Sequence, residues 1–135
     1  MALKEKNNNK KFKKKNHSLR QSFGYAFEGF GYALSTVRNL KIHLIFTVLV
    51  ILAGMFFGIT TTEYIICLFC VALVISLELV NTAIEEAVDV ASPEINPVAK
   101  RSKDVAASAV LFAAIMSAVI GAIIFVPKIL MLFRG

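Results

Sequence analysis

Three long apolar runs dominate the pattern of hydrophobic and polar positions along the chain. Residues 42–62 and 105–126 contain no Asp, Glu, Lys or Arg, and residues 64–84 contain only Glu78. Each run has about 20 residues, enough for an α-helix to cross a hydrocarbon core of about 30 Å. The pattern predicts an all-α membrane protein with transmembrane helices at about 42–62, 64–91 and 98–126.

The expected helix ends follow from short polar segments and prolines. The connection at 58–63 is short, which predicts that the first two spans are antiparallel neighbours. Pro93 and Pro97 cannot continue a helix, and each disfavours helical backbone at the residue before it. The second helix is therefore expected to end near Ala91, and the third to begin near Val98.

The N-terminal 40 residues follow two further patterns. Apolar residues recur at three- and four-residue steps across residues 19–40, which is typical of an amphipathic helix lying at the membrane surface. Residues 1–18 are rich in Lys and Asn and lack apolar periodicity, which favours a disordered tail that meets anionic lipid head groups rather than nucleic acid. The predicted organisation is a basic tail at 1–18 and one membrane domain at 19–135.

The distribution of positive charge orients the spans. Ten of the fifteen Lys and Arg residues precede the first run, three lie between the second and third runs, and two lie near the C-terminus. By the positive-inside rule, the N-terminus and the second loop are expected in the cytoplasm and the C-terminus outside. A hydrophobic fraction of 57% and a mean hydropathy of +0.70 also exclude a soluble single domain and favour a multi-pass protein of the cell membrane.

A stripe of polar residues marks the end of the second span. At about 100° per residue, Glu78, Glu85 and Asp89 fall within about 20° of one direction on the helix, and Asn81 lies about 60° away. An ionisable group at membrane depth costs on the order of 3 kcal/mol, so such a stripe calls for a protein partner, a metal or a water-filled site. The charge distribution places it on the cytoplasmic side, within reach of nucleotides and Mg²⁺.

The stripe and a Lys103-Asp104 pair at the base of the next helix supply the groups that phosphoryl transfer requires. That chemistry needs a divalent ion, cationic groups and a carboxylate that orients or deprotonates the attacking hydroxyl. A small ion-binding or transport oligomer is an alternative of another class, although a pore is expected to carry polar groups towards both faces. Cys67 and Cys70 are interpreted as packing residues inside a span, and His43 as an interfacial side chain.

Two segments carry a resemblance to a known family. Residues 78–85 read Glu-Leu-Val-Asn-Thr-Ala-Ile-Glu, and residues 99–107 read Ala-Lys-Arg-Ser-Lys-Asp-Val-Ala-Ala. These segments resemble the small prokaryotic diacylglycerol kinase family, and residues 38–43 and 124–128 are similar to its Gram-positive branch, typically undecaprenol kinases. The resemblance implies a homotrimeric bundle of three membrane helices and a surface helix per chain, with composite active sites at the cytoplasmic interface. It also implies ATP- and Mg²⁺-dependent phosphorylation of a membrane lipid alcohol, with undecaprenol as the expected acceptor and diacylglycerol as the alternative.

The same resemblance implies a role for each polar residue. Glu78 matches a general base for the lipid hydroxyl, and Glu85 matches a ligand of the divalent metal. Nucleotide contacts are implied for Tyr25, Glu85, Lys103 and Asp104, and a supporting polar role for Asn81 and Asp89.

Val37 is where this chain departs from the family pattern, which has a second metal-binding Glu at that position. Glu28 cannot replace it simply, because nine residues along a helix turn it about 180° away. Mg²⁺ is commonly held by one or two carboxylates together with phosphates and water, so a weakened but active enzyme is expected. An inactive relative with a scaffolding role is the alternative that Val37 raises.

Overall fold

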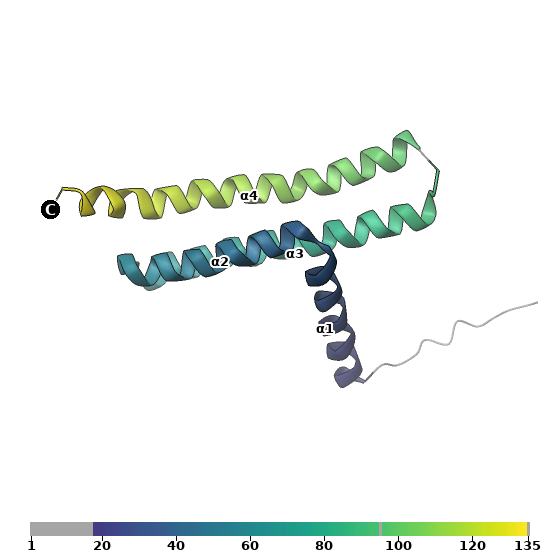
Figure 1. Cartoon of the computed structure of the whole chain (residues 1–135), viewed down its shortest axis with the longest axis horizontal. Coiled ribbons are helices and arrows are strands. Elements are labelled where there is room, and N and C mark those ends of the chain that lie inside the picture. Colours follow the sequence, from purple (N-terminus) through teal and green to yellow (C-terminus); the bar gives the residue numbers. More distant parts are fainter. Residues whose placement is uncertain (1–17, 95, 135) are drawn as a thin grey trace, which may run out of the picture.

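The computed structural model describes residues 18–94 and 96–134, and that part of the chain forms helices without any strand. The helices are α1 (Leu19–Thr36), α2 (Arg38–Phe57), α3 (Thr61–Ala91) and α4 (Pro97–Leu132). α2, α3 and α4 run lengthwise beside one another, whereas α1 leaves them at a steep angle (Figure 1). The predicted all-α fold is confirmed. The basic tail predicted at 1–18 lies, apart from Ser18, outside the described residues.

Three of these helices are long and apolar enough to cross a membrane: α2, α3 and α4. α3 has 31 residues and α4 has 36, which at about 1.5 Å per residue gives lengths of about 46 and 54 Å. Both exceed a hydrocarbon core of about 30 Å, so their ends extend beyond it. The chain is thus a multi-pass membrane protein.

The end of α1 differs from the predicted boundary at residue 40. The carbonyl oxygen of Tyr32 accepts hydrogen bonds from the side chains of Ser35 and Thr36, which offers the backbone an alternative to further helix. Val37 then adopts an extended conformation, with φ −91° and ψ 111°, and Arg38 begins α2. Residues 38–40 therefore belong to the first membrane helix and not to the surface helix. The apolar periodicity did not reveal this break, because Val37 is itself apolar.

The first membrane helix ends at Phe57, earlier than the predicted residue 62. Gly58 takes a left-handed conformation with φ 59°, which only glycine adopts without steric cost, and its N–H donates to the carbonyl oxygen of Gly54. The side chain of Thr60 and that of Glu63 then form a capping box that starts α3. The three-residue turn makes α2 and α3 antiparallel neighbours, as predicted.

α3 and α4 form the longest helix pair in the described chain. α3 ends at Ala91 as predicted, and Asn96 caps α4 by accepting a hydrogen bond of 2.8 Å from the Val98 N–H. α4 continues to Leu132, beyond the predicted residue 126, because Pro127 removes a single backbone donor without ending the helix. Ion pairs join the two helices near both ends: Glu63 with Lys128 at 3.2 Å, and Asp89 with Lys103.

Gly54 marks a close approach of α2 to the start of α3. A Cβ atom added there would lie 2.7 Å from the Tyr64 ring and hydroxyl oxygen and 2.9 Å from Ile59 Cδ1. The Tyr64 hydroxyl donates to the Ile51 carbonyl oxygen at 3.3 Å, which limits how far the ring can withdraw. We predict that Gly54→Ala destabilises the protein by about 1–3 kcal/mol, the usual cost of overpacking.

The control for this prediction is Gly121→Ala in α4, where an added Cβ would meet no atom within 4 Å. This change gains helix propensity without a clash, so it should leave stability unchanged or raise it. Thermal unfolding of both variants in detergent measures the difference. An equal melting temperature for the two variants would contradict the predicted clash.

Candidate active site

A polar pocket of about 290 Å³ lies where the link between α1 and α2 meets α3. Four carboxylates contribute to it, together with one buried amide. The pocket is lined by Thr36, Val37, Asn39, Glu78, Asn81, Thr82, Glu85, Glu86 and Asp89. The structure therefore gathers the whole polar stripe at one pocket, as its helical spacing indicates.

Glu78 occupies the deepest position of this stripe. The residue is only 3% exposed. The ion pair between Glu63 and Lys128 marks the opposite membrane boundary of α3. A hydrocarbon core of about 30 Å spans about 20 helical residues, so from Glu63 it reaches roughly to residue 84. Glu78 then lies within the apolar zone, and Glu85 lies at its boundary.

The carboxylate of Glu78 faces a histidine of the neighbouring helix. His43 Nε2, from the second turn of α2, lies 3.3 Å from Glu78 Oε1, with side chains 24% and 4% exposed. The position of His43 at the start of the first span predicts an interfacial side chain but does not predict this contact with Glu78. The antiparallel pairing of the two helices could have revealed this contact. Residues at equal distances before and after the turn at 58–60 lie at the same height, so position 43 lies level with about position 75, about one helical turn from Glu78.

Asn81 links the stripe to the next carboxylate. Its Nδ2 donates a hydrogen bond of 2.8 Å to Glu85 Oε1. Its Oδ1 is buried and has no hydrogen-bond partner within residues 18–94 and 96–134. A buried acceptor without a donor is uncommon, and it is suited to bind a cation or a ligand donor.

The oxygen donors of the pocket fit Mg²⁺. Glu85 and Asn81 Oδ1 are hard ligands of the kind that this ion prefers, and Mg²⁺ commonly takes one or two carboxylates and completes its shell with phosphates and water. In the described residues no group of three or more His, Cys, Asp and Glu side chains forms a ready metal cage. These few oxygen ligands therefore suit a Mg²⁺ ion that binds together with a phosphate group better than one that the protein holds by itself.

α3 and α4 meet beside the pocket through Asp89 and Lys103. Lys103 Nζ pairs with the Asp89 carboxylate across the α3–α4 interface. Asp104 instead pairs with Lys100 at 2.6 Å on the exposed side of α4 and does not line the pocket. Lys103 and Asp104 thus lie beside each other in sequence but in separate ion pairs.

α1 reaches the pocket only by its last turn. The hydrogen bond that Tyr32 donates to the Glu86 carboxylate raises the pKa of Tyr32 above its usual 10.0, and the negative charge adds to this effect. Val37, in the extended link, lines the pocket directly. Tyr25 lies earlier on α1, is exposed, and does not line this pocket.

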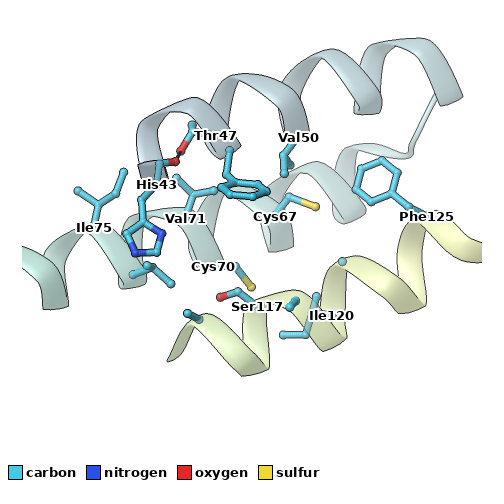
Figure 2. A pocket seen from close by; sticks show the side chains of 15 residues that line it. His43, Thr47, Val50, Cys67, Cys70, Val71, Ile75, Ser117, Ile120 and Phe125 are labelled. Carbon is cyan, nitrogen blue, oxygen red and sulfur yellow. Dashed lines mark hydrogen bonds between the residues drawn. The ribbon is translucent and has the colours of Figure 1, made fainter. Parts of the chain in front are cut away.

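A second cavity, of about 390 Å³, lies between α2, α3 and α4. Figure 2 shows His43 at one end and Phe125 at the other, with Cys67 and Cys70 between them. The lining is apolar apart from a few side chains, and both thiols are free and buried, as the packing interpretation expects. His43 lines this cavity and Glu78 lines the polar pocket, so the His43–Glu78 contact links the linings of the two cavities.

The residues that build both spaces fall within the region matched by a family model. The model described as prokaryotic diacylglycerol kinase matches residues 24–125. The chain belongs to this family. Membership makes it a lipid kinase, and the resemblance inferred from the two polar segments is confirmed.

Two relatives of this chain differ in their named substrates. The chain is 37% identical over 109 residues to the undecaprenol kinase of Bacillus subtilis (strain 168), covering 81% of this chain and 89% of that protein. It is 38% identical over 116 residues to a diacylglycerol kinase of Synechocystis sp. (strain ATCC 27184 / PCC 6803 / Kazusa), covering 85% of this chain and 66% of that protein. Both matches extend over most of this chain.

Proposed function

We propose that this protein transfers the γ-phosphoryl group of ATP to undecaprenol, with diacylglycerol as the alternative acceptor. The observation that carries this proposal is the buried Glu78 carboxylate, which lines an oxygen-rich pocket and contacts His43, a residue that lines an apolar cavity. A lipid alcohol combines a hydroxyl with a hydrocarbon chain, so its two parts match these two spaces. The undecaprenol kinase relative, matched over 89% of its length, favours undecaprenol.

Glu78 is the proposed general base. As the hydroxyl oxygen of the lipid attacks the γ-phosphorus, its proton passes to the Glu78 carboxylate, and the bond to the leaving ADP oxygen breaks. A base on a membrane helix meets a hydroxyl that cannot leave the head-group boundary. The depth of Glu78 inside the apolar zone supports this role.

Glu85 and Asn81 are the proposed holders of Mg²⁺ through their oxygen atoms. When bound with ATP, this ion supplies charge neutralisation on the phosphate oxygens. Asn81 keeps the Glu85 carboxylate in place by its 2.8 Å hydrogen bond. Lys103, which Asp89 holds beside the pocket, supplies a cationic group for the nucleotide phosphates.

Asp104 and Tyr25 are proposed nucleotide contacts, and their positions favour a site shared between chains. Neither residue lines the polar pocket of its own chain. The membrane helices also expose many large apolar side chains, among them Phe46, Phe69 and Phe112, which suits contact with lipid and with further copies. These observations support a homotrimer with composite sites.

The proposed orientation puts the polar pocket on the cytoplasmic side and the C-terminus outside. It rests on the excess of Lys and Arg before α2 and between α3 and α4. α1 leaves the bundle steeply, which suits an amphipathic helix lying along the membrane surface, with the basic tail meeting anionic head groups (Figure 1). The polar stripe occupies only one end of α3, which favours this reading over an ion-conducting pore.

The test is a transfer assay with the purified full chain in lipid nanodiscs. Radiolabelled ATP, Mg²⁺ and either undecaprenol or diacylglycerol are supplied, with a chelator control. Faster labelling of undecaprenol, abolished by the chelator, is the expected result. Faster labelling of diacylglycerol would select the alternative acceptor, and labelling of neither lipid would favour an inactive scaffold.

Restoring a carboxylate at position 37 should strengthen metal binding. Val37 lines the polar pocket with Glu85, so Val37→Glu places a second charged ligand beside the proposed Mg²⁺ site. We predict that this change lowers the Mg²⁺ concentration for half-maximal rate by about threefold to tenfold, because Mg²⁺ affinity rises with carboxylate ligands. Titration of Mn²⁺ followed by its paramagnetic resonance signal measures the same change without turnover.

The matched control is Val37→Gln, which has the size of Glu without its charge. It should leave both titrations near wild type, and lipid preference should change in neither variant. Overlaid metal titrations for Val37→Glu and wild type would mean that position 37 does not serve the metal.

A further inference from the structure

His43 contacts the one carboxylate of the stripe that lies inside the apolar zone. Its Nε2 is 3.3 Å from Glu78 Oε1, and the Glu78 side chain is only 4% exposed. In the described part of the chain, no other side chain pairs with this carboxylate. A buried carboxylate with a single partner takes its orientation from that partner.

We propose that His43 is a positioning residue for the Glu78 base, an inference that rests on the proposed function. In the reactive complex the imidazole donates its Nε2–H to Glu78 Oε1, which leaves Oε2 to accept the proton of the lipid hydroxyl. In this structure the two atoms lie 3.3 Å apart without the alignment of a hydrogen bond. Catalytic hydrogen bonds are often long or poorly aligned before substrate binds and tighten in the reactive complex.

The position of His43 makes this orientation useful. The imidazole belongs to the lining of the apolar cavity, whereas Glu78 belongs to the lining of the polar pocket. The pair therefore fixes the carboxylate at the border that a lipid hydroxyl crosses to meet a phosphate. Without the imidazole, the carboxylate is free to turn towards the other polar groups of the pocket.

In this role His43 is a hydrogen-bond donor and does not itself take the proton of the substrate. In the proposed step the hydroxyl oxygen forms a bond to the γ-phosphorus, and the bond to ADP breaks with its electron pair on ADP. The hydroxyl proton goes to Glu78 Oε2, and the His43 proton stays on Nε2 throughout.

Three substitutions separate this role from a packing role. His43→Gln places an amide donor near the position of Nε2, His43→Asn places it near Nδ1, and His43→Leu fills similar space without a donor. The variants are assayed as full chains in nanodiscs with ATP, Mg²⁺ and undecaprenol. Melting temperatures are measured alongside.

His43→Leu and His43→Asn should each lower kcat about tenfold, with KM for ATP and for lipid within about twofold of wild type. His43→Gln should recover kcat to within about threefold of wild type. In a Glu78→Gln background, His43→Leu should cause no further loss, because the base that His43 orients is already absent.

Several results would overturn the role of His43. The first is a wild-type kcat in His43→Leu, and the second is a kcat for His43→Gln no higher than that for His43→Asn. The third is a change in the KM for lipid alone in His43→Leu. The fourth is a further tenfold loss of kcat when His43→Leu is added to Glu78→Gln. If His43→Leu does not fold, the comparison of Gln with Asn decides between the outcomes. A wild-type chain without kinase activity would overturn the proposed function and this role together, whereas an active wild type isolates the failure to His43.

Discussion

Glu78→Gln should lower kcat by about 100-fold to 10,000-fold, the range that general base catalysis contributes. The amide keeps the size of the side chain and can still accept a hydrogen bond from His43, but it cannot take the proton of the lipid hydroxyl. Folding should be preserved because the buried group stays polar and paired. Single-turnover transfer of labelled phosphate to lipid measures the loss.

The control for Glu78→Gln is Glu94→Gln, the same chemical change at an exposed position in the loop between α3 and α4. Activity of this variant should equal that of wild type. Turnover of Glu78→Gln at the wild-type rate would remove Glu78 from the role of base, whatever the lipid acceptor.

Glu85→Ala should raise the Mg²⁺ concentration for half-maximal rate by about tenfold to 100-fold. The change removes the proposed carboxylate ligand and leaves Asn81 Nδ2 without its acceptor at 2.8 Å. Loss even of an outer partner at a metal site commonly costs about tenfold to 100-fold in affinity. A Mn²⁺ binding titration by paramagnetic resonance should weaken in parallel with the kinetic titration.

Glu86→Ala provides the comparison for Glu85→Ala, because it removes the same charge from the neighbouring position of α3. The Glu86 carboxylate acts on the Tyr32 hydroxyl of α1, whose pKa it raises, so Glu86→Ala should leave the Mg²⁺ concentration for half-maximal rate near that of wild type. A Glu85→Ala titration that matches wild type would make Glu85 an ordinary solvated carboxylate at the membrane boundary.

The polar stripe could be predicted from sequence because one helix contains all of it. Helical geometry fixes the relative directions of Glu78, Asn81, Glu85 and Asp89 without reference to any other element, and the pocket contains these four. The length of the apolar runs likewise predicts the spans, since a hydrocarbon core of about 30 Å needs about 20 helical residues. Their roles in catalysis stay predictions that the proposed substitutions test.

Features that depend on two elements were harder to predict. The break at Val37 depends on side-chain hydroxyls that bind the Tyr32 carbonyl, and the His43–Glu78 contact depends on how α2 packs against α3. Apolar periodicity carries no information on either feature, because it describes which side of a helix is apolar and not what faces it. The separate ion pairs of Lys103 and Asp104 depend on the same kind of information about α3 and α4.

The ion pairs at both ends of α3 and α4 limit where the chain can change in length. The spacing between Glu63 and Asp89 on α3 is nearly equal to the spacing between Lys103 and Lys128 on α4. A single alignment of α3 against α4 therefore allows both ion pairs to form. Deleting a single residue between the two acids would turn one end of α3 by about 100° relative to the other and shift it by about 1.5 Å. The Asp89 pair would then separate, and the stripe would rotate out of its pocket. Insertions and deletions among homologous chains should therefore fall in the turn at 58–60 and the loop at 92–96, and spare the helix between Glu63 and Asp89.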